Sequence, residues 1–320
     1  MKPFVAACAL ACAFALCAEA AEPPFAIAVH GGAGTITRAT LSPESERAHR
    51  AALVEALEAG RRILAAGGTS LDAVTAAVRV LEDSPHFNAG RGAVFTSEGT
   101  NELDASIMDG ATLRAGAVAG VTNVRNPVEA ARAVMEKSGH VLLAGRGAER
   151  FAKEQGLAIV DPSYFRTEER WREFRRGKGD GKLGTVGAVA LDRAGNLAAA
   201  TSTGGIANKR FGRVGDSPLV GAGTWAENAS VAVSATGTGE MFIRTAAAHD
   251  IAALVKYKGL APEAAAREAL AKVVALGGTG GVIVLDRGGD PIFSFTTEGM
   301  YRGFAKGGGK AQVQVFREEP

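Results

Sequence analysis

The chain has 320 residues, 42 of them glycine, with few aromatic side chains and a formal net charge of +2. This length allows one large α/β domain or two ordinary ones, with a substantial buried core. The one dense basic cluster, at residues 170–182, is interrupted by acids and glycines, so we expect a solvated linker there and no nucleic-acid binding. No membrane span is expected after residue 20.

The first 20 residues have the pattern of an export signal. Lys2 precedes an apolar run at residues 4–16, and the A-E-A triplet at 18–20 has the small-residue spacing of a cleavage site. A buried N-terminal helix would leave that triplet unexplained, and the apolar run before the first cysteine is too short for a lipoprotein signal. The cysteines all lie in this segment: Cys8, Cys12 and Cys17. We therefore expect a periplasmic or secreted protein that begins at Ala21 and contains no thiol.

The first half of the mature chain alternates strand and helix patterns. Residues 25–30 alternate as a half-buried strand, and Ser42 with Pro43 predicts the start of a helix. Thr69 and Asp72, at capping-box spacing, predict a second helix. A glycine-punctuated, strand-like stretch, a strand and two more helices are expected at residues 88–110, 116–121, 127–137 and 145–155.

The second half is expected to contain a hairpin, a loop, a strand, two helices and another hairpin. Residues 184–205 and 278–299 resemble each other, since each has two strand patterns around a D-R-x-G-[ND] turn. Adjacent antiparallel strands with helices before and between them favour sheets faced by helices over a doubly wound parallel sheet. Because each half supplies only part of the strands, neither is expected to be self-sufficient.

Several common catalytic motifs are absent from the sequence, among them G-x-S-x-G, the phosphate-binding loop and H-E-x-x-H. His30, before a glycine-rich segment, is interpreted as part of a structural turn because no nucleophile elbow accompanies it. Hydroxyl groups among glycines stand out instead, at Thr185, at 201–205 and at 234–240. Such segments have the N–H and O–H donors of an oxyanion hole, although ordinary turn chemistry explains each one taken alone.

Arg213 and Asp216 lie three positions apart in a loop around Gly215. An Arg and an Asp at this spacing usually form a surface salt bridge. The same pair could hold an amino-acid headgroup, because a guanidinium binds a carboxylate and a carboxylate binds an ammonium group. The residues alone leave both interpretations open.

Thr185 lies between a charged segment, residues 167–182, which we expect to be solvated and flexible, and a strand pattern that begins at Val186. A threonine needs a base to act as a nucleophile, and a chain-terminal threonine has one in its own α-amine. Cleavage of the bond between Gly184 and Thr185 would create that amine. The sequence therefore predicts that Thr185 begins a new chain.

These motifs resemble the plant-type L-asparaginases, also called isoaspartyl peptidases, which are threonine-dependent N-terminal nucleophile hydrolases. The segments that carry the resemblance are residues 30–34, 87–110, 184–205, 212–226 and 233–244. The resemblance implies an α+β fold in a four-layer αββα sandwich. It also implies self-cleavage into an alpha subunit, 21–184, with a flexible linker at about 155–184, and a beta subunit, 185–320, and a dimer of the processed αβ units.

The resemblance implies roles for single residues. Thr185 is similar to the nucleophile and Thr203 to the residue hydrogen-bonded to it, while the Thr236 hydroxyl and the Gly237 N–H resemble the oxyanion hole. Arg213 resembles the residue that binds the substrate α-carboxylate.

Further implied positions bind the headgroup or a metal ion. Asp216 and the Gly239 carbonyl resemble the groups that bind the substrate α-amine, and Asn88 resembles a supporting polar group. No cofactor is implied for catalysis, but a structural sodium ion is, held by the backbone carbonyls of Leu81, Glu82, Ser84, Phe87, Ala89 and Arg91.

The implied reaction is hydrolysis of β-aspartyl dipeptides and L-asparagine, small molecules that share one headgroup, to release L-aspartate. Glycosylasparaginase is an alternative, although its nucleophile usually follows an aspartate where this chain has Gly184. A periplasmic amino-acid-binding protein is a second alternative, which predicts an uncut chain.

Overall fold

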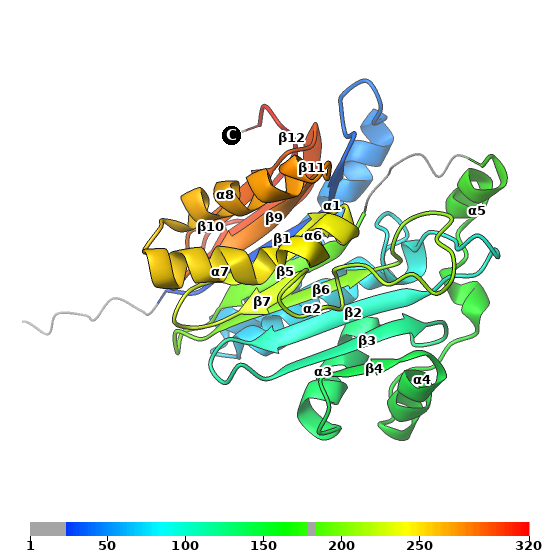
Figure 1. Cartoon of the computed structure of the whole chain (residues 1–320), viewed down its shortest axis with the longest axis horizontal. Helices are drawn as coiled ribbons and strands as arrows, with labels where there is room; N and C mark the ends of the chain where they lie inside the picture. Colours follow the sequence, from blue (N-terminus) through cyan, green and yellow to red (C-terminus); the bar gives the residue numbers. More distant parts are fainter. Residues whose placement is uncertain (1–23, 178–183, 320) are drawn as a thin grey trace, which may run out of the picture.

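The computed structural model of the chain describes residues 24–177 and 184–319. Within these residues two sheets lie face to face, and helices cover the outer side of each (Figure 1). The larger sheet has the spatial order β12 (Gln312–Phe316), β11 (Gly299–Lys306), β1 (Ala26–Gly34), β5 (Val186–Leu191), β6 (Leu197–Thr203), β2 (Leu103–Asp109), β3 (Ala115–Val121) and β4 (Leu142–Ala144). The smaller sheet has the order β10 (Pro291–Phe295), β9 (Gly280–Leu285), β8 (Ala232–Gly237) and β7 (Thr224–Ala226).

Each sheet has its own layer of helices. The larger sheet packs against α1 (Pro43–Ala65), α2 (Ser70–Asp83), α3 (Pro127–Lys137) and α4 (Gly145–Glu154). The smaller sheet packs against α6 (Gly239–Thr245), α7 (Ala247–Lys258) and α8 (Pro262–Ala275). The predicted α+β fold in four αββα layers is confirmed.

The helix starts follow the predicted capping chemistry. The Ser42 side chain accepts a hydrogen bond from the Ser45 N–H, with Pro43 as the first helical residue of α1. Thr69 caps α2 in the same way by accepting from the Asp72 N–H. One face of α1 is buried, and at Gly60 a Cβ would lie 2.9 Å from the Ala73 carbonyl oxygen, so the missing side chain lets α2 approach closely.

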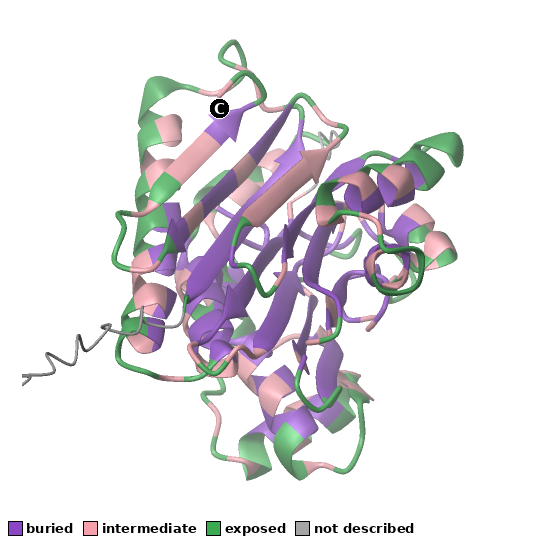
Figure 2. Cartoon of the chain, turned by 90° about the vertical axis from the view of Figure 1, so that its left-hand side faces the viewer, coloured by how far each residue is buried: buried purple, intermediate pink, exposed green. Residues whose placement is uncertain are grey.

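Alternation along the central strands separates two apolar layers. Figure 2 shows these central strands almost wholly buried, whereas exposed residues lie on helices, in loops and on outer strands such as β4 and β12. On β1, Ile27 and Val29 contact the helix layer, whereas Ala26 and Ala28 face the smaller sheet. Small side chains dominate between the sheets, so the two sheets lie close together and polar groups in that layer have no access to water.

Strands from before and after Gly184 lie next to one another in the larger sheet. Strand β1 pairs with β5 and β11, and β2 pairs with β6, in each case antiparallel. Only β3 and β4 in this sheet pair in parallel within the described residues. The segments on either side of Gly184 therefore build one sheet together, as expected from their incomplete strand sets.

The charged segment before Thr185 differs from the prediction. We expected residues 155–184 to be flexible, but they contain the 3-10 helix η2 (Pro162–Phe165) and helix α5 (Glu168–Arg175). Thr167 caps α5 by accepting from the Arg170 N–H, and the rings of Trp171 and Phe174 lie 5.3 and 5.5 Å from the Phe95 ring. The expectation of flexibility is wrong for this part, because two aromatic side chains anchor it. Residues 178–183 lie outside the described residues.

Other parts of the sequence prediction were incomplete. His30 lies inside β1 and not in a turn, and the strand continues past a bulge at Gly31. The stretch at 88–110 is a strand only from Leu103, after the 3-10 helix η1 (Gly90–Gly92) and a loop. Helix α6 and strands β11 and β12 were not predicted. The predicted export segment lies outside the described residues, and none of the described helices is long and apolar enough to cross a membrane.

Candidate active site

Thr185 immediately precedes β5, between β1 and β6 in the larger sheet, and is 7% exposed. Its Oγ1 donates a hydrogen bond to Thr203 Oγ1 at 3.1 Å. Thr203 Oγ1 lies 3.2 Å from the carbonyl oxygen of Gly184 and donates to it. The candidate nucleophile, its predicted partner and the predicted scissile carbonyl are thus in contact while Gly184 and Thr185 are still joined.

Asn88 also acts on the Gly184 carbonyl. Its Nδ2 donates to the Gly184 oxygen at 2.7 Å and to the Gly205 oxygen at 2.6 Å. Its Oδ1 accepts from the Val94 N–H at 2.9 Å, which fixes the orientation of the amide. Asn88 was predicted only as a supporting polar group, and the structure places it directly at the predicted cleavage point.

The predicted headgroup residues line one cavity with Thr185. Its walls include Thr185, Thr203, Arg213, Asp216 and Gly237. In the uncut chain the cavity measures only about 10 Å³, and Gly184 forms part of its wall. This volume holds about one water and no amino acid, so the cavity must open before it can bind a headgroup.

Gly239 lies against both charged headgroup residues. A Cβ at this position would lie 2.7 Å from Arg213 Nη2 and 2.8 Å from Asp216 Oδ1. The two charged groups therefore converge on one point, as headgroup binding requires, and they make no salt bridge of the kind left open by the sequence.

Arg213 pairs instead with Glu240, which the sequence reasoning missed. Arg213 Nε donates to Glu240 Oε1 at 2.9 Å and Nη2 to Oε2 at 3.0 Å. The hydrogen bonds from Arg213 hold the pKa of Glu240 below its usual value. This fork-to-fork geometry is the one a substrate carboxylate would adopt. The signal available in the sequence was an acid directly after the glycine-rich segment at 234–239.

Two polar atoms of the site are buried without a partner in the described part of the chain, Asp216 Oδ2 and Thr236 Oγ1. Burial raises the pKa of Asp216 to about 7, although the nearby Arg213 charge opposes this rise. An unpaired acceptor in the wall of this cavity, and an unpaired donor next to its wall residue Gly237, are suited to a ligand with an ammonium group and an oxygen. Thr236 is fully buried at the end of β8, beside Gly237.

A buried ion pair lies beneath the loop that carries Arg213. Lys209 Nζ donates to the Glu102 carbonyl oxygen at 3.1 Å and lies 3.5 Å from Glu102 Oε2 and 4.0 Å from Asp104 Oδ2. Asp104 pairs with Thr203 across β2 and β6. Burial raises the pKa of Asp104, while the Lys209 charge opposes the rise. This pair connects the loop to the strands under the site.

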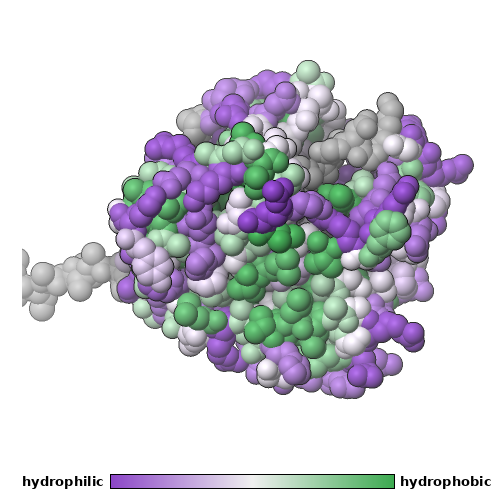
Figure 3. Space-filling model, viewed as in Figure 1, coloured by the Kyte–Doolittle hydropathy of each residue, from purple (hydrophilic) through white to green (hydrophobic). Residues whose placement is uncertain are grey.

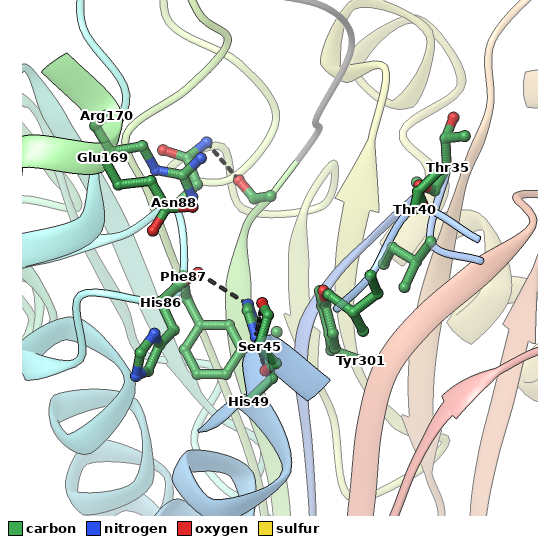
Figure 4. A pocket seen from close by; sticks show the side chains of 15 residues that line it. Thr35, Thr40, Ser45, His49, His86, Phe87, Asn88, Glu169, Arg170 and Tyr301 are labelled. Atoms are coloured by element: carbon green, nitrogen blue, oxygen red, sulfur yellow. Dashed lines mark hydrogen bonds between the residues drawn. The ribbon is translucent and has the colours of Figure 1, made fainter. Parts of the chain in front are cut away.

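A second cavity, of about 120 Å³, lies on the other side of Gly184. Figure 4 shows its wall of aromatic and polar side chains, with Asn88 directed at Gly184 and His49 beside Tyr301. The His49 and Tyr301 rings stack with centroids 4.3 Å apart. Glu169 and Arg170 of α5 complete the wall, so the segment before the cleavage point closes this cavity.

The predicted sodium site begins in the last turn of α2 and continues into the loop after it. Gly90 and Gly92 face backbone oxygens of that site, since a Cβ on Gly90 would lie 2.3 Å from the Glu82 oxygen and one on Gly92 2.1 Å from the Phe87 oxygen. Carbonyl oxygens around a space kept free by glycines fit a hard cation. Among residues 24–177 and 184–319, no cluster of His, Cys, Asp and Glu side chains offers an alternative metal site.

Two facing sheets between helix layers, with a hydroxyl side chain immediately before a central strand, are the fold and the candidate site of the N-terminal nucleophile hydrolases. The sequence profile of the asparaginase family matches residues 23–315. The chain belongs to this family and is an enzyme.

Similar proteins cover nearly the same length. The isoaspartyl peptidases of Salmonella typhimurium and Escherichia coli are 54% and 53% identical over 91% and 92% of this chain, and over 98% and 96% of their own lengths. The plant-type L-asparaginase of Pyrobaculum calidifontis is 46% identical over 88% of this chain and 97% of its own.

Proposed function

We propose that this enzyme cleaves itself between Gly184 and Thr185 and then hydrolyses β-aspartyl (isoaspartyl) dipeptides and L-asparagine to release L-aspartate. One observation carries the proposal. Thr185, whose Oγ1 is hydrogen-bonded to Thr203, lines a cavity together with Arg213 and Asp216. The names of the relatives, isoaspartyl peptidase and plant-type L-asparaginase, support the substrate class.

In self-cleavage, Thr185 Oγ1 attacks the Gly184 carbonyl carbon. Asn88 Nδ2 and Thr203 Oγ1 donate to the oxygen on which negative charge develops. The hydroxyl proton passes to the Thr185 amide nitrogen, the C–N bond breaks, and an ester joins Gly184 to Oγ1. Water hydrolyses the ester, which leaves the Gly184 carboxylate and a free α-amine on Thr185.

In substrate hydrolysis, that α-amine takes the proton of Oγ1 as the oxygen attacks the β-carbonyl carbon. Arg213 binds the substrate α-carboxylate in place of Glu240, and Asp216 with the Gly239 carbonyl binds the α-ammonium group. The Thr236 hydroxyl and the Gly237 N–H donate to the oxyanion. The leaving amine departs with the proton, and water then releases aspartate.

The test compares Thr185→Ala with Thr185→Ser. The Ala variant should remain one chain by intact mass and show no turnover of asparagine or β-aspartyl-leucine. The Ser variant keeps a hydroxyl and should cleave and turn over more slowly, because the missing methyl group no longer restricts the rotamer. Two fragments from the Ala variant, or substantial turnover, would identify another nucleophile.

We also propose a structural sodium ion at the last turn of α2 and the loop after it. The carbonyl oxygens of Glu82 and Phe87 beside Gly90 and Gly92 support it. At equal ionic strength, the melting temperature should be higher in sodium chloride than in choline chloride. Gly90→Ala, whose Cβ would collide with the Glu82 oxygen, should abolish this difference.

A dimer of processed αβ units is a further proposal. Figure 3 shows apolar side chains gathered in the middle of the face on which β7, β2 and β3 lie. A groove there is lined by Leu113 and Val141, 50% and 54% exposed, together with Val220 and Trp225. Leu113→Lys should shift the sedimenting species from dimer to monomer. Tyr257→Lys, an exposed aromatic on α7, is the matched control.

We propose export of the protein by removal of residues 1–20, supported by the sequence pattern of Lys2, an apolar run and A-E-A. N-terminal sequencing of exported protein should read Ala-Glu-Pro-Pro. A sequence that starts at Met1 would contradict the proposal.

A further inference from the structure

A chain of buried polar side chains runs between the two sheets, from Thr185 to the loop that carries Asp216. Its members come from five strands and are all 0% exposed: His30, Ser234, Thr201, Thr224 and Ser106. None of them has a role in the reaction proposed above, and the sequence analysis interpreted His30 only as part of a turn.

Short contacts connect the members. His30 Nε2 lies 2.9 Å from Ser234 Oγ, which lies 2.7 Å from Thr201 Oγ1. Thr224 Oγ1 donates to Thr201 Oγ1 at 2.6 Å. Ser106 Oγ lies within donating distance of both Thr224 Oγ1, at 2.8 Å, and the carbonyl oxygen of Ser217, at 2.6 Å.

The apolar surroundings explain why these hydroxyl groups must hydrogen-bond to one another. Ala28, Val189 and Ile283 belong to the same inter-sheet layer, so a polar group there has no water to replace a missing partner. The backbone at Gly187 also leaves space for the contact between His30 and Ser234. A Cβ on Gly187 would lie 2.0 Å from Ser234 Oγ and 2.5 Å from His30 Nε2, so only glycine leaves room for their contact.

The direction in which these hydroxyl groups donate determines which nitrogen of the neutral His30 imidazole carries the proton. Because Thr224 donates to Thr201, the Thr201 proton is directed either to Ser234 at 2.7 Å or to the Gly223 carbonyl oxygen at 3.2 Å. Donation to the Gly223 oxygen would reverse the direction, whereas when Thr201 donates along the shorter contact, Ser234 donates in turn to His30 Nε2. The proton of a neutral imidazole then lies on Nδ1.

Nδ1 is directed away from this chain of hydroxyls. It makes no hydrogen bond of standard geometry with the residues that the structure describes. Burial lowers the pKa of His30 to about 3, and the nearby Thr185 backbone opposes this shift. His30 pairs with Gly187 across β1 and β5, two residues after Thr185. The ring is therefore neutral and next to the nucleophile's backbone.

We propose that His30 is a positioning residue for Thr185. Its Nδ1–H, oriented by the hydroxyl chain, holds the Thr185 backbone so that Oγ1 faces the carbonyl carbon. This holds in self-cleavage and, resting on the proposed function, in substrate hydrolysis. A neutral ring also places no positive charge beside the α-amine that must accept a proton.

Two substitutions at His30 separate its two nitrogen atoms. The amide N–H of His30→Asn can occupy the place of Nδ1–H, whereas that of His30→Gln reaches the place of Nε2. The Asn variant should cleave itself within about fivefold of the wild-type rate. The Gln variant should cleave itself at least about twentyfold more slowly, because loss of one donor to a reacting group slows a reaction by roughly this factor or more. Equal rates for the two variants would overturn the proposal.

A second pair of variants avoids the ring altogether. Thr201→Val removes the central hydroxyl at constant shape, and Thr75→Val is the matched control, a buried threonine that donates to the Leu71 carbonyl within α2. With melting temperatures recorded for both, only Thr201→Val should slow self-cleavage, by about tenfold, and lower kcat for asparagine with KM unchanged. Equal effects of the two substitutions would overturn the proposal.

Self-cleavage is read by intact mass and needs no substrate. If the wild-type chain cleaves itself but hydrolyses neither asparagine nor β-aspartyl-leucine, the proposed function fails, while the comparison of the His30 variants still decides the role of His30.

Discussion

Asn88 and the hydrolytic oxyanion residues lie at different places in the uncut chain. Asn88 and Thr203 contact the Gly184 oxygen, whereas Thr236 Oγ1 has no partner among the residues described. The geometry therefore suggests that self-cleavage and substrate hydrolysis stabilise their oxyanions with different donors. The two reactions should respond differently to substitution.

Asn88→Asp removes the donor and keeps an acceptor for the Val94 N–H. It also places a negative charge beside the oxygen on which charge develops. Self-cleavage should slow by about 10²–10³-fold, the usual effect of losing one oxyanion donor. The time course of intact mass after purification measures this rate. A rate within about fivefold of wild type would remove Asn88 from the cleavage step.

The pKa of Asp216 predicts a pH dependence of substrate binding. Burial raises this pKa to about 7, so the protonated form prevails below pH 7, and only the ionised form attracts an ammonium group. As the pH falls from 8 to 6, KM for asparagine should rise by about tenfold. Asp216→Asn should have a high KM that does not vary over this range. A flat wild-type profile would contradict the assignment.

At the scale of elements, the loop between β6 and β7 carries Arg213 and Asp216 and is anchored by Lys209. The Lys209 side chain is 1% exposed beside Asp104, which is fully buried. Removing one member of a buried ion pair leaves an uncompensated charge. The conformation of the loop between β6 and β7 therefore depends on the contact of Lys209 with Asp104, a strand residue far away in the sequence.

Lys209→Met should lower the free energy of unfolding by about 3–5 kcal/mol. The double variant with Asp104→Asn should recover much of this loss, because the buried carboxylate is then neutral. Chemical denaturation of the four proteins of this cycle measures both effects. Strict additivity of the two substitutions would show that the pair is not coupled.

At the scale of the whole molecule, β5 and β6 lie between β1 and β2 in the larger sheet. Residues 21–184 alone would lack the two central strands, and 185–320 alone would lack the strands on either side. After the proposed cleavage, the two chains would share backbone hydrogen bonds along β1–β5 and β2–β6. They should remain together without a covalent link.

Residues 21–184, expressed alone, should therefore fail to give a cooperative unfolding transition, whereas the cleaved protein should elute as one species under native conditions. Circular dichroism during heating and size-exclusion chromatography check the two statements. A stable, cooperatively folded alpha subunit would contradict the interleaved sheet.

The sequence by itself determined the helix starts, and its resemblance to a known family supplied the layered fold class and most of the candidate site residues. Caps such as Ser42 and Thr69 act over three residues, so the sequence alone predicts them. The motifs around the candidate site are also short and continuous in the sequence, namely those at Thr185, Thr203, Arg213 and Asp216. It did not reveal that Trp171 and Phe174 anchor the segment before Thr185 on Phe95.

Only the tertiary structure decided which groups act on each other. The contact of Asn88 with Gly184 spans 96 positions and that of His30 with Ser234 spans 204. Neither is encoded in a local pattern, since each depends on which strands become neighbours and which face of the sheet each side chain takes. A buried polar group needs a partner, but the partner is chosen by the packing of the two sheets.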